Sequence, residues 1–450
     1  MRDINILYIS YSFPPINAAA SFRALKLTNG LHEHGIHATV LTKNIEKEFH
    51  IHRTTDLNLL KEINKRSRVL RARYFSPTVF HLPFKIMGLV TRIIRGKKKV
   101  ASRTELKERG GIPKDPFVPD HYIEWLPLAL KKVMDFKKKR NFDLIYASGP
   151  PFSVHVLGYL LKAMLRKPLI VEYRDVLTDD PYNKAPEFKE KINRFLERTI
   201  LKNADAVTSV SGPIIDEIVK KHGLESARNK FFELPSAFDP ADFEKVGPAK
   251  PEKGKFTITI TTTLYGDRKP DVLFKVLSKL KKDKIFAGIE FEVNIYGYND
   301  YERFKPQLQK LDIDDIVHFK GFIPHDTCLA VMKKSTFNLD LGEQNFDYPT
   351  LPYHFWEYIG SGKKILHFGK SGHYKASYVV KNDLGYVLPA EHPKQVYVIL
   401  ADLVRGFKTN KLETQLSSDI ASQQTWVSRV RLLSGIMHLV WNAKNTKQKE

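Results

Sequence analysis

The residues that could do chemistry gather first around a single glutamate. Glu357 lies among aromatic residues in TLPYHFWEYIGSGKKILHFG (350–369), and a Gly-Ser-Gly-Lys-Lys run follows it. A phosphate-binding P-loop requires Gly-x-x-x-x-Gly-Lys-[Ser/Thr], in which backbone N–H groups hold phosphates and the hydroxyl binds magnesium. Glu357 stands in the place of the first glycine and Lys364 in the place of the hydroxyl. The segment therefore excludes P-loop chemistry, and its glycines are typical of a helix end that leads into a strand.

A second candidate is the basic turn in LYGDRKPDVL (264–273). A strand pattern precedes the turn, and Pro270 and Asp271 favour the start of a helix directly after it. Arg268 and Lys269 should therefore lie near a helix N-terminus, where free N–H groups and the helix dipole attract anions. The alternative is that Arg268 is an ordinary solvated loop arginine.

These residues need a scaffold, and strand and helix signals alternate along the first half of the chain. Strand patterns cover 4–10, 37–42, 143–148, 168–175 and 205–211, with helical patterns between them. Strands separated by helices predict a parallel sheet that is covered on both faces. The same alternation restarts after a break rich in Pro, Lys and Glu, with strand patterns at 256–263, 291–297, 316–321, 336–342, 364–369 and 385–389.

The sequence therefore predicts an α/β protein of two doubly wound, Rossmann-like domains. We expect the domains at 1–240 and 256–408, a linker at 241–255, and a C-terminal helix and tail at 409–450. The last segment, TWVSRVRLLSGIMHLVWNA, is apolar nearly all round and should pack across both domains. Ligands should bind in a central cleft where the carboxyl ends of the two sets of strands face each other. A cleft that closes suits an enzyme that joins two substrates and excludes water.

The bulk composition agrees with two folded domains. A chain of 450 residues with 42% hydrophobic content is too long for one ordinary core. Its single cysteine, Cys328, excludes an intrachain disulfide and every multi-cysteine metal site. The N-terminal stretch MRDINILYIS has no signal-peptide shape, so we expect a cytoplasmic protein.

The net charge of +23 predicts a polyanionic neighbour: nucleic acid, an anionic lipid surface or phosphorylated substrates. Part of the excess lies in an insertion at about 77–115, where apolar residues recur at helical spacing among Lys and Arg. This pattern predicts a basic amphipathic helix on an anionic membrane. A core-packed helix with a solvated basic rim fits it equally well. A second basic run, 131–140, is typical of a solvated helix end.

Four stretches resemble, in order, the GT-B glycosyltransferases and in particular the retaining family 4. They are YISYSFPPINAAASFRALKLTNGLHEHGIHATVLT (8–42), YASGPPFSVHVLGYLL with PLIVEYRDVLTDDPY (146–182), TTTLYGDRKPDVLFKVLSKL (261–280) and LPYHFWEYIGSGKKILHFG (351–369). The order of the four stretches, more than any one of them, makes the resemblance specific.

The resemblance implies roles in the second domain. Arg268, with Lys269, would contact the diphosphate of a nucleotide-sugar donor, and Glu357 would accept hydrogen bonds from the ribose hydroxyls. The alternative for Glu357 is a helical glutamate that points to water. The donor site would be completed by residues at a helix start and at two strand ends, namely Pro352, Tyr353, His354, Gly297 and Gly321.

The chain also departs from the family. Pro349 stands where members with a Glu-x7-Glu motif have their first glutamate, and His354 stands where the usual lysine of Pro-Ser-Lys would be. The resemblance therefore leaves open which group orients the transferred sugar.

On the acceptor side, the loop after the first strand contains Pro15 and then has Asn17, Ala18, Ala19 and Ala20 where the family usually has glycines. Such a loop is small but stiffer than one built on glycine. Glu172, Arg174 and Asp175 end a strand at the expected cleft, and either carboxylate could take a proton from an acceptor hydroxyl. Alternatively, Arg174 and Asp175 pair with each other or cap the next turn. His155 is more typical of a packing residue than of a catalytic one.

The preferred hypothesis is a metal-independent glycosyltransferase, without a cofactor, that is peripheral on the cytoplasmic membrane. It would move a sugar from a nucleotide-sugar donor to a lipid-linked or polysaccharide acceptor, with retention, and would bind no specific nucleic acid. A sugar-nucleotide epimerase or a phosphorylase of the same fold stays open, because a fold does not define a function. A non-catalytic protein that binds anionic lipid or nucleic acid is a third hypothesis, but binding of single-stranded nucleic acid would require a basic stripe interleaved with exposed aromatics.

Overall fold

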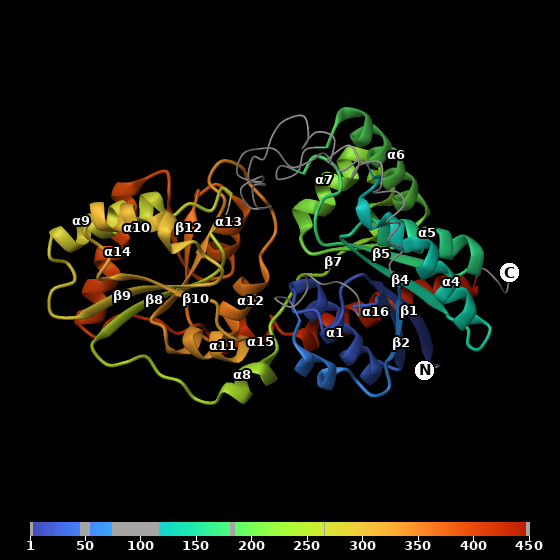
Figure 1. The fold of residues 1–450 in the computed structure, drawn as a ribbon, viewed down its shortest axis with the longest axis horizontal. Coiled ribbons are helices and arrows are strands. Elements are labelled where there is room, and N and C mark those ends of the chain that lie inside the picture. The colour runs from blue at the N-terminus through green and yellow to red at the C-terminus, as the bar shows by residue number, and fades with distance from the viewer. Residues whose placement is uncertain (1–2, 46–54, 74–116, 181–184, 265, 447–450) are drawn as a thin grey trace, which may run out of the picture. The chain divides into compact units, whose positions relative to one another are not determined.

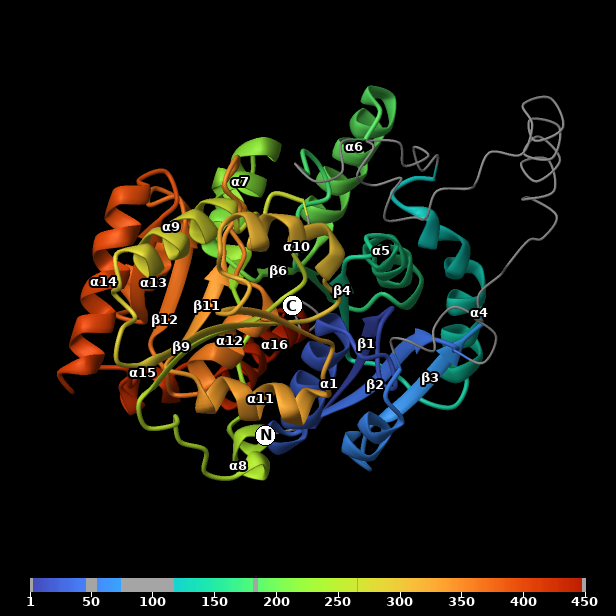
Figure 2. The same cartoon turned by 60° about the vertical axis from the view of Figure 1, so that its left-hand side comes forward.

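A computed structural model describes residues 3–45, 55–73, 117–180, 185–264 and 266–446. These residues form two compact units (Figures 1 and 2). The first unit runs to Leu234 and resumes at Val430, and the second runs from Pro235 to Arg429. The basic amphipathic stretch expected at 77–115 lies outside the described residues.

The first unit is built on a seven-stranded sheet in the order β3-β2-β1-β4-β5-β6-β7, in which every neighbouring pair is parallel. Its strands are β1 (Ile4–Ser10), β2 (Ile36–Lys43), β3 (Arg68–Ala72), β4 (Leu144–Gly149), β5 (Leu169–Tyr173), β6 (Ala206–Ser209) and β7 (Phe231–Glu233). Most residues of β1, β4 and β5 are buried, because helices cover both faces of a parallel sheet.

The α-helices of the first unit are α1 (Ala19–Leu31), α4 (Leu126–Lys137), α5 (Ser153–Leu165), α6 (Glu187–Asn203), α7 (Gly212–His222) and most of α16 (Trp426–Thr446). Short 3-10 helices lie at η1 (His32–His34), η2 (Leu57–Glu62), η3 (His121–Trp125) and η4 (Glu225–Lys230). Helix α16 packs directly on α1, since a Cβ atom added at Gly30 would lie 2.7 Å from Cγ2 of Val430. The last helix is therefore part of the first unit's core.

The second unit is built on a six-stranded parallel sheet in the order β10-β9-β8-β11-β12-β13. Its strands are β8 (Lys255–Thr261), β9 (Glu290–Tyr296), β10 (Val317–Gly321), β11 (Phe337–Leu341), β12 (Ile365–Gly369) and β13 (Gly385–Pro389). Its helices are α8 (Pro240–Val246), α9 (Asp271–Lys282), α10 (Tyr301–Lys310), α11 (His325–Lys334), α12 (Tyr353–Gly360), α13 (Tyr374–Lys381), α14 (Pro393–Lys408) and α15 (Ser418–Ser422).

The expected linker, 241–255, begins inside α8. That helix forms because Pro240 occupies its first position and the carboxylate of Asp239 accepts a hydrogen bond from the backbone N–H of Ala241 at 3.0 Å. Residues 235–255 belong to the second unit, and within the expected linker the irregular stretch is 247–254, between α8 and β8.

Both sheets have the doubly wound topology that the sequence predicts. In each, the strand order reverses next to the unit's first strand, between β1 and β4 in one unit and between β8 and β11 in the other. Loops at the carboxyl ends of the strands on either side of such a reversal part from each other and leave room for a ligand. The prediction of two Rossmann-like α/β domains is therefore confirmed.

Candidate functional site

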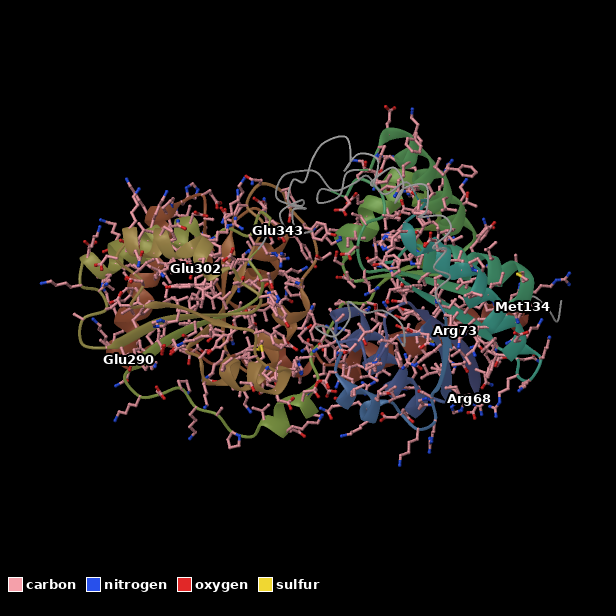
Figure 3. The ribbon with its side chains drawn as sticks, in the orientation of Figure 1. Arg68, Arg73, Met134, Glu290, Glu302 and Glu343 are labelled. Atoms are coloured by element: carbon pink, nitrogen blue, oxygen red, sulfur yellow. The ribbon has the colours of Figure 1, made fainter. Side chains whose placement is uncertain are left out.

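The first group of residues lies at the reversal point of the second sheet. Arg268 follows β8, and Glu343 follows β11, so the topology brings the two loops together. Nε and Nη2 of Arg268 lie 3.0 and 2.9 Å from Oε1 of Glu343, and Nζ of Lys375 lies 2.5 Å from Oε2. The Glu343 side chain, labelled in Figure 3, is 1% exposed and that of Arg268 is 11% exposed. Arg268 is therefore not a solvated loop arginine.

The turn that carries Arg268 is fixed by Asp267. Its carboxylate accepts hydrogen bonds from the backbone N–H groups of Gln344 and Asn345 at 2.7 and 2.5 Å, and also from the Asn345 side chain. The side chain of Gln344 in turn donates to the carbonyl oxygen of Lys269 at 2.7 Å. Because both loops are tied at several points, the arginine is held in place before any ligand arrives.

A cleft of about 320 Å³ opens beside this turn. Its lining consists of Leu264, Gly266, Arg268, Lys269, Pro270, Asp271, Arg303, Phe304 and Gln307. Helix α9 begins at Asp271, and none of the side chains that the structure describes caps its N-terminus. The cleft therefore combines three basic side chains with an uncapped helix N-terminus, which together favour an anion.

Glu357 lies on α12 and faces the protein interior, where it is 7% exposed. Nε2 of His325, the first residue of α11, lies 2.6 Å from Oε1 of Glu357. Burial alone would lower the pKa of His325, but the hydrogen bond and charge of Glu357 raise it above the ordinary value. The alternative in which Glu357 points to water is wrong, and Oε2 has no hydrogen bond from any residue that the structure describes.

His354, which replaces the family's usual lysine, belongs to a buried histidine–aspartate cluster. Its Nε2 lies 3.1 Å from Oδ1 of Asp340, and Nδ1 of His367 lies 2.8 Å from Oδ2. Burial alone would raise the pKa of Asp340, but the hydrogen bonds with the two histidines hold it well below its usual range. His354 stands in the first turn of α12, after Pro352 and Tyr353, so the cluster fixes the start of that helix.

Gly297 and Gly321 are brought together at the ends of β9 and β10. The N–H of Gly297 donates to the carbonyl oxygen of Gly321 at 2.9 Å, and φ angles of 129° and 71° favour glycine at both positions. The residue after each glycine is an exposed aromatic, and the rings of Tyr298 and Phe322 stack with centroids 4.7 Å apart. Sequence reasoning found the glycines but missed this aromatic pair.

In the first unit, Glu172 is not at a surface. Its side chain is 0% exposed and its Oε1 accepts hydrogen bonds from Nε and Nη2 of Arg23 at 3.0 and 2.7 Å. Tyr146 donates to the same oxygen at 2.7 Å and Ser148 donates to Oε2 at 2.5 Å. Burial alone would raise the pKa of Glu172, but Arg23 outweighs it and the pKa is lowered. The proposal of Glu172 as a base is therefore wrong, because it is an enclosed, ion-paired carboxylate.

Arg174 and Asp175 follow Glu172 at the end of β5 and are both half-buried. Nε of Arg174 donates to the carbonyl oxygen of Gly149 at 3.2 Å, and Nη2 donates to that of Pro150. Burial lowers the pKa of Arg174. Arg174 thus holds the loop after β4. Of the two predicted carboxylates, Glu172 and Asp175, only Asp175 stays a candidate for contact with an acceptor.

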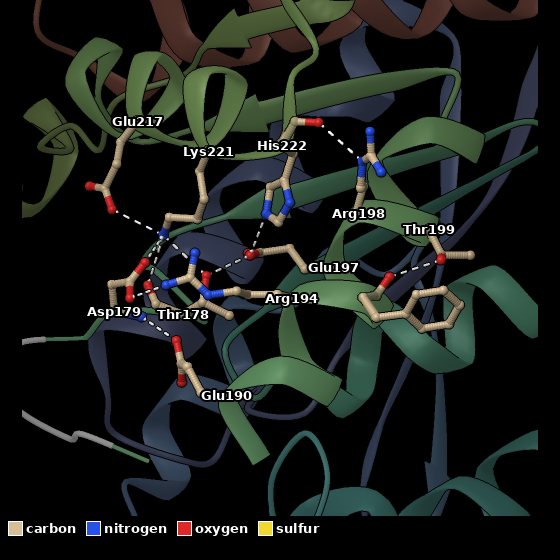
Figure 4. A network of polar contacts seen from close by, with 11 residues as sticks. Thr178, Asp179, Glu190, Arg194, Glu197, Arg198, Thr199, Glu217, Lys221 and His222 are labelled. Atoms are coloured by element: carbon tan, nitrogen blue, oxygen red, sulfur yellow. Dashed lines mark hydrogen bonds and ion pairs between the residues drawn. The ribbon is translucent and has the colours of Figure 1, made fainter. Parts of the chain in front are cut away.

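A polar network fixes the chain that follows Asp175 (Figure 4). Glu197 of α6 accepts a hydrogen bond from Thr178 at 2.8 Å and lies 2.8 Å from Nε2 of His222. Lys221 of α7 donates to the carbonyl oxygen of Thr178 at 2.9 Å and forms an ion pair with Asp179 at 3.1 Å. The loop after β5 is therefore anchored to both helices.

The predicted acceptor loop is shorter than expected. Ala19 and Ala20 form the first turn of α1, because alanine favours the helix, and Ala18 is the residue that precedes it. Pro15 is buried and its carbonyl oxygen accepts a hydrogen bond from the N–H of Asp56 at 2.8 Å, whereas Asn17 is half-buried. His155 is buried, and burial lowers its pKa to about 4, as suits a packing residue.

Neither a spanning helix nor a metal cluster is found where the structure can be described. Among those residues no helix is long and apolar enough to cross a membrane. The same residues contain no group of three or more His, Cys, Asp and Glu side chains arranged to hold a metal ion.

Comparison with known proteins identifies the class. Residues 20–231 match the family model described as Glycosyltransferase Family 4. No curated protein sequence matches the chain. Residues 20–231 are therefore similar to that family, and with the two doubly wound domains the chain is a glycosyltransferase of the GT-B fold.

Solved structures agree on the fold. Sucrose-phosphate synthase from Thermosynechococcus elongatus is 12% identical with a TM-score of 0.61, and the match covers 98% of this chain and 100% of that one. Anabaena HepE, solved in complex with UDP-glucose, is 13% identical with a TM-score of 0.51 over 99% and 100%. A structure described as a putative UDP-N-acetylglucosamine 2-epimerase from Listeria monocytogenes is 12% identical with a TM-score of 0.51 over 95% and 94%. At these identities the likeness concerns the fold alone.

Proposed function

We propose that the protein moves a sugar from a nucleotide-sugar donor to a lipid-linked or polysaccharide acceptor at the cytoplasmic membrane face, with retention of configuration. The observation that carries the proposal is the pairing of an anion cleft around Arg268 with a buried carboxylate, Glu357, on the same edge of the second sheet. A nucleotide sugar needs both features, because it presents a diphosphate and a ribose with adjacent hydroxyl donors.

The diphosphate end is assigned to Arg268, Lys269 and the start of α9. When the bond to the sugar breaks, negative charge builds up on the departing diphosphate, and fixed cations and N–H groups stabilise that charge. Arg268 is already oriented by Glu343, so little reorganisation is needed when the donor binds. This arrangement supplies the charge stabilisation without a metal ion.

The ribose end is assigned to Glu357. His325 occupies Oε1 and thereby fixes the carboxylate, while Oε2 stays open to the ribose hydroxyls. The stacked rings of Tyr298 and Phe322 provide a flat apolar surface at neighbouring strand ends, which suits a nucleobase. UDP-glucose bound to Anabaena HepE supports a donor of this class.

Glu343 is the carboxylate that we assign in place of the family's first glutamate, whose position Pro349 occupies here. It lies six positions earlier in the chain, directly after β11, and holds both Arg268 and Lys375. We assign it the positioning of these two cations around the donor. With Glu172 enclosed, the acceptor hydroxyl loses its proton to Asp175 or to the departing diphosphate itself.

The class of acceptor and the membrane location are proposed from the net charge of the chain and from the amphipathic pattern of its sequence. The net charge of +23 and the amphipathic spacing at about 77–115 support a lipid-linked or anionic glycan acceptor at a membrane surface.

One experiment tests the proposal. Purified protein is incubated with a panel of nucleotide sugars, with and without EDTA, while nucleoside diphosphate release and the unfolding temperature are followed. We expect one donor to raise the unfolding temperature and to release diphosphate in EDTA when acceptor is present. The proposal fails if no nucleotide sugar stabilises the protein. Conversion of a nucleotide sugar to an isomer without diphosphate release would establish the epimerase instead.

A further inference from the structure

A second basic cleft lies in the first unit, at the amino-terminal edge of its sheet. The cleft has a volume of about 260 Å³. Asn5, His37 and Thr39 line it from the starts of β1 and β2, and Arg66, Arg68 and Arg140 line it from neighbouring segments. This edge is the one opposite to the strand ends at which ligands of doubly wound domains ordinarily bind.

The fold brings the three arginines together from two distant segments. Thr39 pairs with Arg68, which places Arg68 (labelled in Figure 3) at the first residue of the edge strand β3. Arg66 precedes it by two positions, and Arg140 comes shortly after the end of α4. The basic run 131–140 is thus more than a solvated helix end, because its last residue faces a defined cleft.

The three guanidinium groups have no carboxylate partner among the residues that the structure describes. The two nearby aspartates contact other residues of the cleft lining instead: Asp3 lies 3.1 Å from Nε2 of His37, and Asp143 accepts the N–H of Asn5 at 2.9 Å. Three arginines that line one cleft without an ion pair of their own repel one another, and an anionic ligand reduces that repulsion.

The geometry points to a phosphate group as the ligand, and we propose that this cleft binds a phosphomonoester or a diphosphate, carried by a small soluble molecule or by a lipid headgroup. Arginine presents planar, forked donors that match phosphate oxygens in pairs. Nucleic acid fits less well, because the lining aromatics, Phe136 and Phe142, stack on each other and Phe142 is buried. The proposal stands apart from the proposed donor site, which lies in the second unit.

The soluble source is tested by calorimetry with glycerol 3-phosphate and with inorganic pyrophosphate. The variant R66Q/R140Q should bind at least one of them roughly tenfold or more weakly than the unaltered protein. The matched control is K65Q/K132Q, which removes the same charge from exposed neighbours that do not line the cleft. R268Q is measured in parallel, and it should retain the binding that R66Q/R140Q loses, which separates this cleft from the donor site.

The lipid source is tested by sedimentation with phosphatidylcholine vesicles that contain or lack phosphatidic acid. If the ligand is a headgroup, the unaltered protein and K65Q/K132Q should sediment with vesicles that contain phosphatidic acid, whereas R66Q/R140Q should stay in the supernatant. The proposal is overturned if none of these probes binds, if R66Q/R140Q binds each as the unaltered protein does, or if K65Q/K132Q loses as much affinity. That last result would show diffuse attraction by surface charge. A negative result for this cleft would not bear on the proposed donor site, because the donor tests concern Arg268 and Glu357.

Discussion

Arg268 and Glu343 form a buried ion pair, with Nη2 of the arginine 2.9 Å from Oε1 of the glutamate, although 75 positions separate them in the chain. The pair joins the loop after β8 to the loop after β11, which are the two loops at the reversal point of the second sheet. An arginine held in this way already points into the 320 Å³ cleft.

Arg268→Gln should weaken binding of a nucleoside diphosphate by roughly 10- to 100-fold, because a charge-assisted hydrogen bond to phosphate is lost. Binding of the free nucleoside should change little, since it carries no diphosphate. Isothermal titration measures both, and Arg405→Gln, an exposed arginine of α14 paired with Asp402, is the control. Equal losses for nucleoside and nucleoside diphosphate would contradict the assignment.

Glu357→Gln should weaken binding of the nucleoside and of the nucleoside diphosphate, because the ribose hydroxyls of each lose a charged hydrogen-bond acceptor. The sharper measurement compares a ribonucleoside diphosphate with its 2′-deoxy and 3′-deoxy analogues. The unaltered protein should prefer the ribose form by about tenfold, and the variant should lose this preference. Glu302→Gln, an exposed glutamate of α10, should behave as the unaltered protein. A variant that still prefers the ribose form would refute the ribose contact.

His325 should make stability depend on pH. Its folded pKa lies above the ordinary value of 6.5 because Glu357 contacts it. Protonated histidine then stabilises the fold fully below the unfolded pKa, and this contribution is lost as the pH rises through the folded pKa. Urea unfolding at several pH values should show that His325→Gln costs most stability in mildly acidic solution and least in alkaline solution. A cost independent of pH would contradict this.

Glu172→Ala should destabilise the protein by about 3–5 kcal/mol, because it leaves Arg23 buried without its partner. The lowered pKa of Glu172 means that its contribution is present above the unfolded pKa and is lost as the pH falls through the folded pKa. Chemical denaturation provides the measurement, and Glu187→Ala, at the exposed start of α6, is the control. If Glu172→Gln instead kept full stability and lost only turnover, a role as base would return.

Gly30→Ala should destabilise the first unit by about 1–3 kcal/mol, because the new Cβ would meet Val430 at 2.7 Å. Gly435→Ala, on α16 itself, is the matched control, since a Cβ there meets nothing within 4 Å. It should raise stability by up to about 1 kcal/mol through helix propensity. Thermal unfolding distinguishes the two, and equal effects would contradict the close packing of α16 on α1.

The fold could be predicted because its signals are local. Buried parallel strands such as Ile4–Ser10 appear in the sequence as apolar runs, and helical patterns separate them. Arg268 and Glu357 could be predicted as site residues for the same reason, because the residues next to each in the sequence indicate the turn or helix in which it stands.

The partners of these residues could not be predicted. Glu343 contacts Arg268 across 75 positions and Lys375 across 32, and Glu172 contacts Arg23 across 149. Nothing near Glu172 in the sequence distinguishes an enclosed ion-paired carboxylate from one at a ligand site. The boundary of the acceptor loop was missed for a different reason, because the helix propensity of Ala19 and Ala20 outweighed the family pattern of a flexible loop.

The packing of α16 on α1 also bears on how the protein is made. During synthesis the first unit's residues leave the ribosome before those of the second, yet the helix that covers Gly30 begins only at Trp426. Part of the apolar surface of the first unit therefore stays exposed until the second unit has been translated and α16 follows it. Nascent chains halted before residue 426 should consequently bind chaperones that recognise exposed apolar surface, and the full chain released from the ribosome should not.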